Sequence, residues 1–241
     1  MAGIWSECIH PGLLRGHNVL VFDGPGQQGQ LFGRQSSFRP DWEHVLSPVL
    51  DTTLALDGID ADRVWVYGVS QGGFWVARAL AFEHRFAAAV TDPGVVDVST
   101  SWMQHLPARL RHLLERGDVQ EFDKEMALGM RFSPDTARTW LFRARPCGAS
   151  GYAETIRAVR AYNVEEVAHQ ITTPLLILSP EDEQFWPGQS QRLAELTPGV
   201  STVVPFTREE GAQGHCQPLG RALTAQRVFD WVEERLGVSA P

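Results

Sequence analysis

The sequence predicts an α/β fold in which a mostly parallel sheet is flanked by helices. Short apolar runs alternate with amphipathic stretches along much of the 241-residue chain, and this alternation is typical of a parallel sheet covered on both faces. The alternation stops between residues 95 and 170, where only helical patterns occur. We therefore expect a core formed by residues 1–94 and 171–241 and a helical cap insertion formed by residues 95–170.

The expected strands are short apolar runs with β-branched residues, bounded by glycine, proline or polar residues. They cover residues 18–23, 64–69, 86–92, 173–178 and 201–206. The expected helices show apolar residues at a spacing of three and four. Besides the end of a helix within residues 1–15, they cover residues 42–56, 75–80, 102–114, 119–130, 134–143, 152–161 and 221–236.

Composition argues against several classes of function. The chain has a net charge of -8 and a pI near 5.5, whereas a nucleic-acid surface needs clustered Lys and Arg. No apolar run approaches the ~20 residues of a membrane span. Cys8, Cys147 and Cys216 are too scattered for a disulfide framework or a Cys-x-x-Cys metal site. We expect a cytoplasmic protein that needs no cofactor or metal, acts on a small molecule, binds neither nucleic acid nor membrane, and can form a homo-oligomer.

The stretch 64–80 predicts a nucleophile elbow. It reads as an apolar strand, then Gly68-Val69-Ser70-Gln71-Gly72-Gly73, then the start of a helix. A serine on such a sharp turn needs small neighbours, which the glycines provide. The turn exposes the Ser70 hydroxyl and leaves the N–H of Gln71 at a helix start, directed toward the place where an oxyanion would form.

A serine nucleophile needs a base, and the base needs a carboxylate that fixes its tautomer. In folds with this elbow the chain order is serine, acid and then histidine. His215 is the histidine that follows the last expected strand, and it lies in a loop rich in glycine. We therefore expect Ser70 as the nucleophile and His215 as the base.

The acid is expected after the strand 173–178, where Glu181, Asp182 and Glu183 are adjacent. Counting back from Pro187 over the usual spacing gives Glu183, whereas the usual residue type favours Asp182. Asp92, after the preceding strand, is a further alternative, although a turn or cap role suits it as well. The residues alone leave this choice open.

Three residues are candidates for contact with the substrate. Gly24 lies in a glycine-rich loop after the first expected strand, and such loops line the ligand crevice of parallel sheets. Trp102 is one of the aromatic and methionine residues of the insertion, which either line an apolar pocket or pack the insertion on itself. Trp186 follows the candidate acids.

Five segments together resemble one branch of the α/β-hydrolases. They are residues 22–27, 68–73, 92–94, 183–190 and 209–216. The branch includes 2,6-dihydropseudooxynicotine hydrolase and the fungal hydrolases that shorten polyketide pigment precursors. The resemblance spans residues 16–236 and implies an α/β-hydrolase fold with a helical cap. It also supports Ser70 and His215 and favours Glu183 as the acid.

The resemblance implies one departure from the family. Relatives carry a helical region and a further strand ahead of the part that matches Met1, and the loop after that strand supplies a second oxyanion N–H. We expect this N-terminal strand to be missing, which would remove half of the oxyanion hole and cost about 10²- to 10³-fold in rate. A truncated gene model is the hypothesis that accounts for it.

Two functions follow from these observations. The first is a serine hydrolase that cleaves an ester or a carbon-carbon bond next to a ketone in a small or medium carbonyl substrate. The second is a catalytically impaired protein of the same fold that acts as a binding or scaffold module. The intact Ser70, His215 and acid positions favour the first, and the missing strand favours the second.

Overall fold

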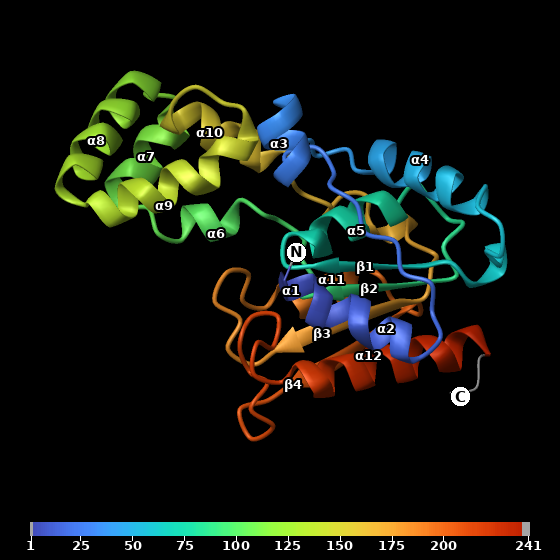
Figure 1. The fold of residues 1–241 in the computed structure, drawn as a ribbon. Coiled ribbons are helices and arrows are strands. Elements are labelled where there is room, and N and C mark those ends of the chain that lie inside the picture. Colours follow the sequence, from blue (N-terminus) through green and yellow to red (C-terminus); the bar gives the residue numbers. More distant parts are fainter. Residues whose placement is uncertain (1, 238–241) are drawn as a thin grey trace. The chain divides into compact units, whose positions relative to one another are not determined.

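A computed structural model describes residues 2–237. Four parallel strands form one sheet in the order β1-β2-β3-β4 (Figure 1). Their bounds are β1 (Trp65–Val69), β2 (Ala88–Asp92), β3 (Leu175–Pro180) and β4 (Ser201–Phe206). Because all four strands run in the same direction, their carboxyl ends meet at one edge of the sheet, where the predicted site residues follow. The expected parallel sheet flanked by helices is confirmed.

Helices precede, separate and follow the strands. Among the described residues they are α1 (Ala2–Ile4), the π-helix η1 (Trp5–Ile9), α2 (His10–Leu14), α3 (Gln28–Arg34), α4 (Glu43–Leu54), η2 (Ala61–Arg63), α5 (Gly72–Leu80), α6 (Thr100–Met103), α7 (Ala108–Arg116), α8 (Val119–Phe132), α9 (Pro134–Ala144), η3 (Arg145–Cys147), α10 (Tyr152–Arg160), η4 (Ala168–Gln170), α11 (Gln189–Leu196) and α12 (Arg221–Leu236). None of the described helices combines the length and the apolar character that a membrane crossing requires.

The chain forms two compact units. The first consists of the described residues in the ranges 1–21, 41–97 and 164–241, and it contains the sheet. The second consists of residues 22–40 and 98–163. It holds α3 and the helices from α6 to α10, so most of the expected helical insertion lies within it.

Helices cover both faces of the sheet in the first unit (Figure 1). On one face, α12 packs on β2, β3 and β4 through a buried cluster that consists of Val90, Leu176, Leu178, Phe206, Ala212, Ala225, Val228, Phe229 and Val232. On the other face, α5 and α11 lie against the sheet, and Gly94 is small enough to fit between Ile177 of β3 and Leu193 of α11. This packing fixes the strand ends and therefore the loops that carry the site.

The predicted strand over residues 18–23 is wrong. These residues form no regular element, and the side chains of Leu20 and Val21 are 48% and 40% exposed. The apolar pattern indicated a strand, but a strand needs a neighbour that accepts and donates its backbone hydrogen bonds. Within the described residues β1 pairs with β2 alone, and no strand lies beside residues 18–23.

Two helical predictions also differ from the structure. The helix expected over residues 102–114 is divided into α6 and α7, because Pro107 precedes α7 and a proline has no N–H to continue the first helix. The loop expected over residues 24–29 is present at 24–27, and the short helix α3 (Gln28–Arg34) begins within its last two residues. The expected bounds of β4 and α12 are confirmed.

Candidate active site

Ser70 occupies a sharp turn between β1 and α5. Its φ of 57° lies in the left-handed region, which a residue with a side chain rarely adopts. The neighbouring glycines are required by close backbone contacts. A Cβ on Gly68 would lie 2.2 Å from the carbonyl oxygen of Gly72, and a Cβ on Gly73 would lie 2.1 Å from that of Pro93. The turn therefore depends on the glycines that the sequence pattern contains.

Gln71 is the N-cap residue of α5 and follows Ser70 directly. In the part of the chain that the structure describes, its backbone N–H has no hydrogen-bond acceptor. A free N–H at the start of a helix is a suitable donor for a developing oxyanion. The expected loss of a second oxyanion donor stays a prediction.

His215 lies between Ser70 and a carboxylate. Its Nε2 is 2.9 Å from the Oγ of Ser70, and its Nδ1 is 2.7 Å from the Oε2 of Glu183. The imidazole is largely buried, and the ring of Phe185 meets it edge-on at 4.7 Å between centroids. The three side chains come from loops at the carboxyl ends of β1, β3 and β4, so the sheet brings together residues that are far apart in the sequence.

Glu183 is held firmly by its own loop. Its second carboxylate oxygen, Oε1, accepts hydrogen bonds from the backbone N–H groups of Phe185 at 2.8 Å and Trp186 at 3.2 Å. The Glu183 side chain is only 6% exposed, so the histidine and the two amides compensate its charge. The carboxylate is therefore oriented toward Nδ1 of His215 before any substrate binds.

Asp182 lies beside Glu183 in the sequence but contacts other groups. Its carboxylate pairs with the guanidinium of Arg208 at the surface. Its backbone N–H donates to the carbonyl of Gln213 at 2.9 Å, and Asp182 forms a parallel bridge with Gly214. Since side chains alternate in direction along extended backbone, the residue after Asp182 is the one directed at His215.

Asp92, the third candidate acid, is buried at the end of β2 and is 1% exposed. Its carboxylate accepts hydrogen bonds from Nε2 of Gln217 at 2.9 Å and from the hydroxyl of Tyr67 at 3.3 Å. Burial raises the pKa of Asp92 to about 7, while these two hydrogen bonds and nearby His215 act in the opposite direction. Burial also raises the pKa of the Tyr67 hydroxyl and of the Cys216 thiol.

The three candidate substrate contacts belong to different units. Trp186 lies in the first unit, and its ring is 5.8 Å from that of His215. Gly24 and Trp102 lie in the second. Trp102 is 7% exposed, and its ring meets Trp140 edge-on at 5.1 Å, with the guanidinium of Arg143 4.4 Å from its centre. Trp102 thus packs the second unit on itself, and its contact with a substrate stays a prediction.

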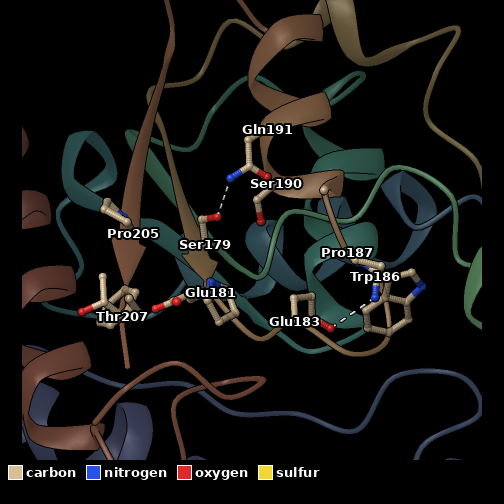
Figure 2. A pocket seen from close by; sticks show the side chains of 12 residues that line it. Ser179, Glu181, Glu183, Trp186, Pro187, Ser190, Gln191, Pro205 and Thr207 are labelled. Carbon is tan, nitrogen blue, oxygen red and sulfur yellow. Dashed lines mark hydrogen bonds between the residues drawn. The ribbon is translucent and has the colours of Figure 1, made fainter. Parts of the chain in front are cut away.

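A pocket of about 280 Å³ opens beside Glu183 (Figure 2). Its walls come from the end of β3, the loop that follows, the start of α11 and the end of β4. Figure 2 shows the Nε2 of Gln191 donating to the hydroxyl of Ser179 and the carboxylate of Glu183 beside Trp186. Neither Ser70 nor His215 lines this pocket, so it borders the acid and not the nucleophile.

Residues 2–224 match the model of a known family, which is described as the alpha/beta hydrolase family. The chain belongs to this family. The fold and the resemblance expected from the sequence are thereby confirmed.

Similar alpha/beta hydrolases include curated fungal proteins and solved structures. Hydrolyase poxO of Penicillium oxalicum strain 114-2 is 41% identical over 93% of this chain and 58% of its own length. Hydrolase LUC6 of a Fusarium species is 26% identical over 94% of this chain and 57% of its own length. The crystal structure of the 2,6-dihydroxy-pseudo-oxynicotine hydrolase shares 24% identity at a TM-score of 0.71, covering 99% of this chain and 58% of that one.

This chain therefore spans a little more than half the length of these relatives. At 24% identity, the solved structure supports the fold alone. The substrates of the relatives are consequently not transferred to this chain by similarity.

Sequence patterns did not single out Gln217 or Tyr67, which enclose Asp92. Gln217 follows His215 by two positions and is completely buried. No local pattern marks a glutamine as buried, and its partner lies 125 residues earlier in the chain. The contacts of Gln217 and Tyr67 with Asp92 could have been predicted only from the three-dimensional arrangement of the strands.

Proposed function

We propose that this alpha/beta hydrolase uses Ser70 as nucleophile, His215 as base and Glu183 as acid on a small or medium carbonyl substrate. The observation that carries the proposal is the position of His215, whose two ring nitrogens lie 2.9 Å from Ser70 Oγ and 2.7 Å from Glu183 Oε2. Both distances are in the range of hydrogen bonds between a nucleophile, a base and an orienting carboxylate.

The proposed reaction has two stages. The Oγ of Ser70 attacks the substrate carbonyl while Nε2 of His215 takes its proton, and the N–H of Gln71 donates to the oxyanion. Collapse of the tetrahedral intermediate breaks the bond to the leaving group, which receives the proton from His215. A water molecule, activated by the same histidine, then attacks the acyl group on Ser70, releases the carboxylic acid product and restores the Ser70 hydroxyl. Glu183 holds the imidazole in the required tautomer and stabilises its charged form.

The bond that breaks is an ester bond or a carbon-carbon bond next to a ketone. A carbon leaving group must depart as a stabilised carbanion, so a second ketone is needed two carbons from the attacked carbonyl. A relative whose name gives a substrate, the 20-hydroxy-prefusarin hydrolase of Gibberella moniliformis, is 35% identical over 40% of this chain and supports hydrolysis of a small organic molecule.

We also propose a cytoplasmic setting and a small-molecule partner. Cys8, Cys147 and Cys216 form no disulfide in the described structure, which suits a reducing compartment. The earlier expectations about nucleic acid, membranes and homo-oligomers stay predictions.

The alternative function is a binding or scaffold module of the same fold. One observation favours it: within the described residues, β1 is paired on one side only, and such an edge can accept a strand from a partner. The arrangement of Ser70, His215 and Glu183 favours catalysis.

Substrate screening tests the proposal. The protein and its Ser70→Ala variant are incubated with p-nitrophenyl esters of increasing acyl length and with aryl β-diketones, and product formation is followed by absorbance. We expect turnover of at least one class by the wild type and none by the variant. Turnover that survives in Ser70→Ala would contradict the role of Ser70, and which class reacts identifies the bond.

A further inference from the structure

A buried carboxylate outside the proposed triad contacts the His215 loop, which we define as residues 207–220 between β4 and α12. Asp92 Oδ1 accepts a hydrogen bond at 2.9 Å from Nε2 of Gln217, which follows His215 by two residues. The amide oxygen of Gln217 in turn accepts from the hydroxyl of Thr224 on α12 at 3.2 Å. Gln217 thus connects the end of β2, the His215 loop and the start of α12.

The His215 loop has an unusual backbone conformation at Cys216 and Gln217. Cys216 and Gln217 both have positive φ values, 55° and 42°, although neither is a glycine. Consecutive residues in this region store conformational strain and persist only where surrounding contacts enforce them. The side chain of Gln217 is completely buried, and its bond to Asp92 is a contact that enforces this backbone.

The backbone of Asp92 contacts the turn that carries the nucleophile, independently of the Asp92 side chain. Its carbonyl oxygen accepts the N–H of Ser70 at 2.6 Å and also the thiol of Cys216 at 3.3 Å. The contact with Ser70 uses main-chain atoms, so it survives substitution of the Asp92 side chain. A substitution at position 92 consequently separates the support of the His215 loop from the support of the nucleophile turn.

We propose that Asp92 is a positioning residue that, through Gln217, holds the His215 loop in the place where the imidazole reaches both Ser70 and Glu183. The inference rests on the proposed function, because it assigns His215 as the base. Asp92 acts through the loop, while the contact with Nδ1 of His215 is made by Glu183.

The surroundings of Asp92 indicate which substitution preserves this support. The titratable groups that influence it are Tyr67 on β1, Glu7 and Cys8 on η1, and Cys216 and His215 on the loop. An asparagine at position 92 can accept from Gln217 through its oxygen and donate to the Tyr67 hydroxyl through its NH₂ group. Alanine at position 92 removes both contacts and leaves the amide of Gln217 buried without its acceptor.

The test compares Asp92→Asn, Asp92→Ala, Gln217→Ala and the double variant Asp92→Ala/Gln217→Ala. Each protein is labelled with a fluorophosphonate, and the labelling rate at Ser70 is followed by intact mass. We expect Asp92→Ala and Gln217→Ala each to slow labelling by about 10- to 100-fold, since a displaced base costs on this order. Asp92→Asn should stay within about 3-fold of wild type, and the double variant should be no slower than either single variant, because both remove one contact.

A proton NMR measurement gives a readout that does not depend on activity. The proton between Nδ1 of His215 and Glu183 should give a downfield resonance in wild type and in Asp92→Asn. We expect this resonance to broaden or vanish in Asp92→Ala and Gln217→Ala. If it persists unchanged in both alanine variants, or if their labelling rates equal that of wild type, the inference is overturned.

Glu233→Gln is the matched control, because Glu233 is also a buried carboxylate of the first unit but pairs with Arg15 and His17. Glu233→Gln should leave the labelling rate and the downfield proton resonance unchanged. If it slowed labelling as much as Asp92→Ala does, the effect would come from general destabilisation, and the inference would be overturned. A wild type that is folded yet unlabelled would contradict the proposed function, and the NMR comparison would still decide the role of Asp92.

Discussion

The turn that carries Ser70 and the loop that carries His215 are held in place by different means. Ser70 is fixed by the backbone: glycines at positions 68 and 73 allow contacts that any Cβ would prevent, and its N–H bonds to the carbonyl of Asp92. The His215 loop also has backbone contacts with Asp182, but it depends in addition on side chains, through Glu183 and through Gln217 on Asp92.

The turn and the loop should therefore tolerate different substitutions. A turn held by backbone contacts fails when a small residue gains atoms, because the obstacle is steric. A loop held by side chains fails when a hydrogen-bonding group is lost, and an isosteric group that keeps the bond restores it. The two regions meet at Asp92. Its main-chain carbonyl accepts a hydrogen bond from the N–H of Ser70 in the turn, and its carboxylate accepts one from Gln217 in the His215 loop.

The largest effect is expected from the carboxylate that orients His215. Glu183→Gln keeps the shape of the side chain but no longer stabilises the charged imidazole or its tautomer. We expect kcat to fall by about 10⁴-fold, as for the corresponding change in serine proteases. The measurement is steady-state hydrolysis of a substrate identified by screening.

Asp182→Asn is the matched control for Glu183→Gln, because Asp182 pairs with Arg208 at the surface. Exposed ion pairs contribute little to the stability of a protein. The kcat of Asp182→Asn should therefore equal that of the wild type. If Asp182→Asn lost activity and Glu183→Gln kept it, the assignment of the acid would be reversed.

A pH effect on stability is expected from Asp92. Its carboxyl has a pKa of about 7 in the folded protein and an ordinary value of 3.8. Between these values the folded protein holds a proton that the unfolded chain has released, so stability falls as the pH rises toward 7 and the loss is complete above it. Asp92→Asn lacks this titration.

The difference in unfolding free energy between Asp92→Asn and wild type should therefore shift in favour of the variant from about pH 4 to about pH 7. The upper limit of this shift is about 4 kcal/mol, because each pKa unit corresponds to about 1.4 kcal/mol. Urea unfolding at several pH values measures it. Parallel stability curves for the two proteins would show that the Asp92 carboxyl titrates normally.

A smaller effect on stability is expected from the glycines of the turn. In Gly73→Ala the new methyl group meets the carbonyl of Pro93, and overpacking of this kind costs about 1–3 kcal/mol. Gly72→Ala is the control, since a Cβ at position 72 meets nothing within 4 Å and Gly72 has no positive φ. Thermal unfolding should separate the two variants, and equal melting temperatures would contradict the steric explanation.

The nucleophile turn could be predicted from the sequence because the rule that governs it is local. Gly68, Ser70 and Gly73 lie within six residues and form a recognisable pattern, although the close contact that requires Gly73 is with the carbonyl of Pro93. The histidine followed from chain order, because His215 comes after the last strand. These features need no knowledge of distant contacts.

Other features depended on register that the sequence does not display. The spacing to Pro187 favours Glu183 and the usual residue type favours Asp182, and the contact between Glu183 and Nδ1 of His215 appears only in the structure. Residues 18–23 have the apolar pattern of a strand, but no strand of the described residues 2–237 pairs with them. The contact between Asp92 and Gln217 joins two segments that are 125 residues apart, and no sequence pattern indicates that these two side chains meet.

The central claim is that His215 and Glu183 activate Ser70. Intact-protein mass spectrometry after fluorophosphonate treatment tests it most directly, with Ser70→Ala and His215→Ala as controls. We expect one adduct on the wild type, none on Ser70→Ala, and strongly slowed labelling of His215→Ala. An unlabelled wild type that is folded, or labelling that is equally fast without His215, would contradict the claim.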